Sequence, residues 1–204
     1  MAENVRKFRN RAWIAAVVGW PVLVAVNYFL LWLANFDLLA FPFGGLLLLG
    51  MLAACWIWAL TGSVVVVVQA CRRRAHVWAV GCLVASVIGA VGVVKTDWER
   101  TFVDTQFSMH RGAFKELGDG FRAGRLGTHT RLPWSMRYLS IDGRAHVRDD
   151  DALYVPVWED WRAESGIGYG YFPTPPGPDT EIRTATGDIG KPVRPLGDGW
   201  WWVE

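Results

Sequence analysis

The chain has 204 residues, of which 52% are hydrophobic, and a formal net charge of +2. The charge is uneven, because residues 1–94 hold seven of the 21 basic residues and two of the 19 acidic ones. The other fourteen basic and seventeen acidic residues give residues 95–204 a net charge of about −3, which excludes a nucleic-acid-binding tail. Seventeen arginines beside four lysines are typical of a GC-rich bacterial genome.

Three long apolar segments fill residues 13–94 and predict transmembrane helices over about 13–34, 43–69 and 75–94. The first segment has no formal charge over roughly 22 residues, which is enough for a helix to cross a hydrocarbon core of about 30 Å. The apolar region of a cleaved signal peptide runs only about 7–15 residues, so we expect the first segment to be retained. The lipid bilayer is therefore the first predicted partner of this chain.

Basic residues near the membrane predict the orientation. Four lie in residues 1–12 and three more, Arg72, Arg73 and Arg74, lie between the second and third segments, whereas only Lys95 and Arg100 lie close to the membrane on the other side. Because cytoplasmic loops carry the excess of Lys and Arg, residues 1–12 are expected in the cytoplasm of a multi-pass plasma-membrane protein. Three crossings then place residues 95–204 outside the cytoplasm.

The interior of the apolar segments argues against a carrier or pump, since no Asp, Glu, Lys, Arg or His lies well within them. Asn27 is expected to make a hydrogen bond between helices, with a pore-lining contact as the alternative. Gly81, Ala85 and Gly89 recur every four residues, a spacing that lets two helices pack closely. We expect them to pack the third helix on the first two, with a homo-oligomer through the third span as the alternative.

Residues 95–204 contain no cysteine, so this part folds without disulfides. Val103, Phe107, Phe114 and Leu117 step by three and four residues and predict one amphipathic helix over about 96–121. Its polar side mixes acidic and basic residues, which favours docking on protein over lying on the membrane surface.

Residues 132–204 predict a small, mostly antiparallel sheet of four to six strands. Asp142 and Gly143 favour a tight turn between two strands, and Pro156 places its strand at an edge or a bulge. Glycines at 166, 168 and 170 share one strand face, where a ring or backbone can pack closely. Residues 173–178 are expected to form a loop. The predicted fold is three transmembrane helices followed by an extracytoplasmic α+β domain.

No motif for catalysis or for a cofactor is present, and the spacings of His110, His129 and His146 match no metal motif. We therefore predict neither a cofactor nor a metal. Large aromatic residues are unusually frequent, and such residues either build a core or form binding hot spots. In a strand, Trp201 should face away from its two tryptophan neighbours. The candidate partner-binding residues are Trp158, Trp161, Tyr169, Tyr171, Trp200, Trp201 and Trp202.

The sequence favours a non-catalytic external domain that binds a protein or cell-envelope partner, in the role of an accessory subunit or an immunity protein. One alternative is a membrane-anchored envelope hydrolase, which needs external histidines and carboxylates to converge in a pocket. The second is a non-catalytic transporter subunit, whose partner would supply the missing intramembrane charges.

Overall fold

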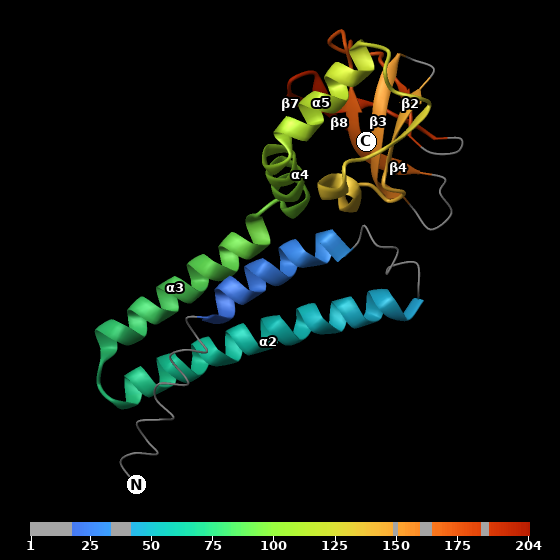
Figure 1. The fold of residues 1–204 in the computed structure, drawn as a ribbon. Coiled ribbons are helices and arrows are strands. Elements are labelled where there is room, and N and C mark those ends of the chain that lie inside the picture. The colour runs from blue at the N-terminus through green and yellow to red at the C-terminus, as the bar shows by residue number, and fades with distance from the viewer. Residues whose placement is uncertain (1–17, 34–41, 149–150, 160–164, 185–187) are drawn as a thin grey trace. The chain divides into compact units, whose positions relative to one another are not determined.

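The computed structural model describes residues 18–33, 42–148, 151–159, 165–184 and 188–204 (Figure 1). The chain divides into two compact units, one of residues 1–31 and 42–99 and the other of residues 32–41 and 100–204. The helical unit contains three apolar helices, and the second unit contains two shorter helices and the β-sheet.

The apolar helices are Val18–Leu33, α2 (Pro42–Arg72) and α3 (His76–Lys95). By length and composition, α2 and α3 are apolar enough to cross a membrane, whereas Val18–Leu33 is shorter. The predicted first span, 13–34, begins and ends outside the described residues. The bounds of α3 lie within one residue of the predicted third span, and α2 runs three residues beyond the predicted end of the second.

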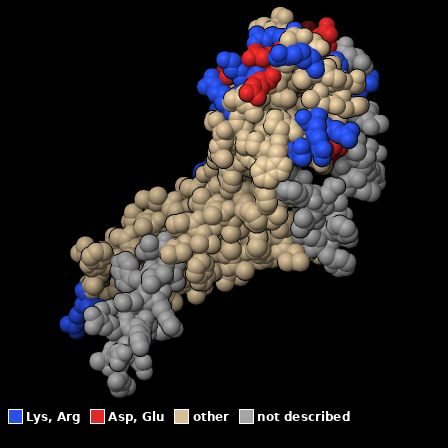
Figure 2. Space-filling model, in the orientation of Figure 1, with Lys and Arg blue, Asp and Glu red and all other residues tan. Residues whose placement is uncertain are grey.

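A tight turn joins α2 to α3 at the predicted cluster of arginines. Arg74 has a φ of 58°, and its N–H donates to the Cys71 carbonyl at 2.9 Å while that of Ala75 donates to Ala70 at 3.0 Å. This pair of bonds satisfies carbonyls at the end of α2 and stops the helix. Arg72, Arg73 and Arg74 are exposed there, and on the face in Figure 2 the helical surface is otherwise almost free of Lys, Arg, Asp and Glu.

The single helix predicted over 96–121 is wrong, because the segment forms two helices, α4 (Trp98–Met109) and α5 (Arg111–Arg122). Thr96 is extended after α3, and His110, at φ −107° and ψ 15°, leaves the helical conformation between α4 and α5. The apolar stripe continues across this break, so periodicity did not reveal it. Val103, Phe107 and Phe114 are buried, as docking on protein requires.

The second unit contains a six-stranded antiparallel sheet in the order β1-β2-β3-β4-β8-β7, with a separate two-stranded sheet, β5-β6. This confirms a mostly antiparallel sheet at the upper end of the predicted strand number. The strands are β1 (His129–Arg131), β2 (Arg144–Arg148), β3 (Ala152–Glu159), β4 (Gly166–Tyr171), β5 (Ile182–Arg183), β6 (Ile189–Gly190), β7 (Pro192–Gly197) and β8 (Trp200–Val203).

The strand predicted before Asp142 is also wrong, since Trp134–Leu139 is a 3₁₀ helix. Gly143 nevertheless has the positive φ, 67°, that the predicted turn requires. The chain uses this turn to lead from the 3₁₀ helix into β2, which pairs with β1 and β3 instead.

The sheet has a core on each face. Helices α4 and α5 cover the helix face, where Phe114 contacts Trp200 and Tyr169 with ring centroids 4.8 and 4.9 Å apart (Figure 1). The outer face carries a second buried cluster: Ala152, Tyr154, Phe172, Ile182 and Val203. The predicted glycine face lies here, because a Cβ on Gly170 would come within 2.7 Å of Val203 and 2.9 Å of Phe172.

Candidate functional site

Four of the candidate partner-binding aromatics belong to the core of the helix face. Tyr169, Tyr171, Trp200 and Trp202 are at most 3% exposed. The indole N–H of Trp200 donates to the carbonyl of Phe114 at 3.1 Å, so the ring is tied to α5. These side chains stabilise the fold and offer no surface to a partner.

The other three candidates lie elsewhere. Trp158 is half-buried between Phe102 and Trp202, with centroid separations of 5.5 and 5.8 Å. Trp201 faces the second cluster, opposite to its two tryptophan neighbours as predicted, and remains partly exposed. Trp161 lies outside the described residues.

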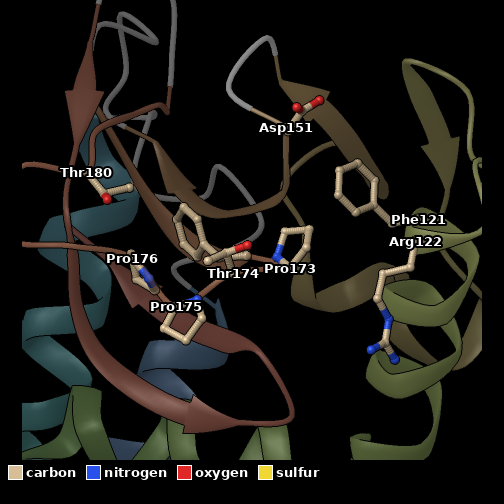
Figure 3. A pocket seen from close by; sticks show the side chains of 9 residues that line it. Phe121, Arg122, Asp151, Pro173, Thr174, Pro175, Pro176 and Thr180 are labelled. Carbon is tan, nitrogen blue, oxygen red and sulfur yellow. The ribbon is translucent and has the colours of Figure 1, made fainter.

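An open pocket of about 690 Å³ lies in the second unit, and the predicted loop at residues 173–178 forms part of its lining (Figure 3). Phe121 and Arg122 reach it from the end of α5, and Asp151 reaches it from the turn before β3. Arg122 pairs with Asp119, and the hydrogen bond that its guanidinium donates to that carboxylate raises the pKa of the guanidinium. The remaining lining follows β4: Phe172, Pro173, Thr174, Pro175, Pro176 and Thr180.

Two of the three histidines of the second unit come together, although their spacing in sequence is seventeen residues. His129 on β1 and His146 on β2 face each other with their Nδ1 atoms 2.8 Å apart. The Nε2 atom of His146 lies 2.8 Å from Oδ2 of Asp142. The register of β1 on β2 brings the two histidines together, and no sequence motif predicts this contact.

Asp142 accepts the hydrogen bonds that hold this group together. Burial alone would raise the pKa of its carboxyl group, but hydrogen bonds from His146, Ser140 and the backbone N–H of Arg144 outweigh burial and lower the pKa to about 2. Asp142 is therefore ionised at neutral pH. The Ser140 hydroxyl lies 2.8 Å from Asp142 and 3.0 Å from the carbonyl of Arg144, so it is committed to this network.

His110 belongs to a different group. Its Nε2 atom lies 2.7 Å from the hydroxyl of Tyr138, which donates to Gln106 at 2.6 Å. Burial lowers the pKa of His110 and so favours its neutral form. Within the described ranges, no group of three or more His, Cys, Asp or Glu side chains is arranged to hold a metal ion.

The residues predicted to pack the helices together lie in different environments. Gly89 packs on Trp20, since a Cβ there would lie 2.9 Å from the indole ring. Gly81 and Ala85 are exposed in the helical unit. Asn27 donates to the carbonyl of Leu23 at 2.8 Å, one turn earlier in its own helix, rather than to a neighbouring helix.

The fold combines an α+β domain with two helices that are apolar enough, by length and composition, to cross a membrane. No family model, curated protein or solved structure matches the chain.

Proposed function

We propose that this chain is an integral membrane protein whose three apolar helices anchor an α+β domain outside the cytoplasm, and that the pocket of this domain binds a protein or cell-envelope partner. The proposal rests on large apolar side chains exposed along α2 and α3, among them Leu46, Leu47 and Val77 at 67%, 73% and 86%. A soluble protein buries such side chains, whereas lipid solvates them.

The burial of the two long helices supports the same conclusion. In the most apolar stretch of each helix, 17% of the α2 residues and 11% of the α3 residues are buried. A core helix of a soluble protein would be covered on most sides by the rest of the chain. Lipid is the solvent that matches these surfaces, and the exposed arginines at the α2–α3 turn favour the cytoplasm for that turn.

The pocket is the surface to which we assign the partner. Its volume lies within the usual range for ligand sites of about 300–1,000 Å³. Phe121 and Phe172 supply apolar contact, while Arg122 and Asp151 supply one charge of each sign. Such a lining fits an extended polypeptide segment that carries both apolar and charged side chains.

Photo-crosslinking in living cells tests the binding site. A photoreactive residue at the exposed pocket position Thr174 is expected to yield a discrete adduct, and adding Arg122→Glu should reduce its yield severalfold. The matched control is the same residue at Val193, which is 52% exposed on β7 and does not line the pocket. Equal adducts at both positions, or none at Thr174, would contradict a partner site in the pocket.

The contact between His146 and Asp142 is the observation that favours the hydrolase alternative, because a carboxylate orients a catalytic histidine in many hydrolases. Neither residue lines the described pocket, however, and Ser140 is committed to Asp142 and to a backbone carbonyl. We therefore place partner binding first.

A further inference from the structure

His129 and His146 bring two imidazole rings into close contact across two paired strands. The two residues are direct partners across β1 and β2, and their rings meet edge to face with centroids 4.9 Å apart. At 2.8 Å, the two Nδ1 atoms have room for one proton between them. One of the two nitrogens must therefore present a bare lone pair to the other.

Asp142 determines which nitrogen that is. An ionised carboxylate only accepts hydrogen bonds, so the Nε2 atom of His146 carries the proton that it donates to Asp142. In neutral His146 the Nδ1 atom is then unprotonated and directed at His129. Histidine ligands of metal ions usually donate their other ring N–H to a carboxylate, a backbone carbonyl or water, and the hydrogen bond from His146 to Asp142 is of this kind.

We propose that His129 and His146 bind one divalent transition-metal ion of the zinc type through their Nδ1 atoms, in place of the shared proton. Zinc binds imidazole nitrogen at about 2.0–2.1 Å, so tetrahedral ligation needs the two nitrogens about 3.3 Å apart. The pair must open by about 0.5 Å to reach this separation. His129 can provide the movement, because it is exposed and lies on the edge strand of the sheet.

Charged side chains around the two histidines affect how strongly the pair can bind a metal ion. Arg131 and Arg144 are the next partners along β1 and β2, they lie on the same face as the histidines, and both are exposed. Their guanidinium groups repel a dication, and Asp142 is the nearby carboxylate that offsets them. We therefore expect binding weaker than at zinc sites with three or four protein ligands, with water or an anionic group in the remaining coordination positions.

Calorimetric titration of Zn²⁺ into the full chain in lipid nanodiscs tests the proposal. Cys71→Ser and His76→Ala are present throughout, because these exposed residues beside the α2–α3 turn are alternative ligands. One ion should bind per chain. His129→Ala and His146→Gln should each weaken binding at least about tenfold, and Asp142→Asn about tenfold, as expected for a carboxylate that orients a ligand.

The controls separate ligation from folding and from background. His146→Gln keeps a donor for Asp142 but lacks imidazole, so a folded variant that no longer binds Zn²⁺ identifies His146 as a ligand. His110→Ala removes the third external histidine and should leave binding unchanged, whereas Arg144→Gln should strengthen it. Absence of binding to the parent protein, or unchanged affinity in His129→Ala and His146→Gln, would overturn the proposal and leave a proton-sharing pair.

Discussion

Replacing Trp200 by alanine is expected to lower the free energy of unfolding by about 3–5 kcal/mol, the usual cost of truncating a fully buried aromatic residue. The ring is 0% exposed and contacts Phe114 and Tyr171, with centroids 4.8 and 5.3 Å away. Its loss also removes the hydrogen bond that the carbonyl of Phe114 accepts from the indole N–H. Urea unfolding of the full chain in detergent micelles, followed by circular dichroism, measures the change.

Trp134 provides a control of the same residue type. It lies at the start of the 3₁₀ helix and is 85% exposed, so Trp134→Ala should change the free energy of unfolding by less than about 0.5 kcal/mol. If the two variants unfold at the same urea concentration, Trp200 does not hold α5 on the sheet as described.

Gly168→Ala should be nearly as damaging, with a loss of about 3 kcal/mol, the upper part of the usual range for overpacking. A Cβ at this position would lie 2.2 Å from the backbone carbonyl oxygen of Val155, so strands β3 and β4 must move apart. Gly112→Ala is the matched control, because nothing lies within 4 Å of a Cβ there. Since alanine favours helix, this variant should be about 0.5–1 kcal/mol more stable than the parent chain. Thermal unfolding of both variants measures this difference in stability. A Gly168→Ala protein as stable as the Gly112→Ala protein would show that the strands can separate freely.

Composition and periodicity predicted the parts of this fold that depend on local pattern. The bounds of α3 follow from an uninterrupted apolar run, and the buried stripe of Val103, Phe107 and Phe114 follows from helical spacing. Pro156 was correctly assigned to a bulge, since the register between β3 and β4 shifts just after it. It does not lie at an edge, because β3 is an inner strand.

What escaped prediction depends on contacts between distant segments. The break at His110 leaves the apolar stripe in phase, so spacing alone cannot distinguish one helix from two. The contact of His129 with His146 requires the register of β1 on β2, which no local pattern encodes. The role of the aromatic residues was ambiguous for the same reason. The sequence does not show whether a tryptophan such as Trp200 is covered by a helix of its own chain or by a partner.

The most direct test of the central claim, a domain anchored outside the cytoplasm, is thiol labelling of intact cells. Cys55, Cys71 and Cys82 are first replaced, and one new cysteine is introduced by Glu116→Cys on α5 or by Arg73→Cys at the α2–α3 turn. A maleimide that cannot cross the plasma membrane should label the Glu116→Cys protein in intact cells and the Arg73→Cys protein only after lysis. The reverse pattern, or recovery of the chain in the soluble fraction, would contradict the account.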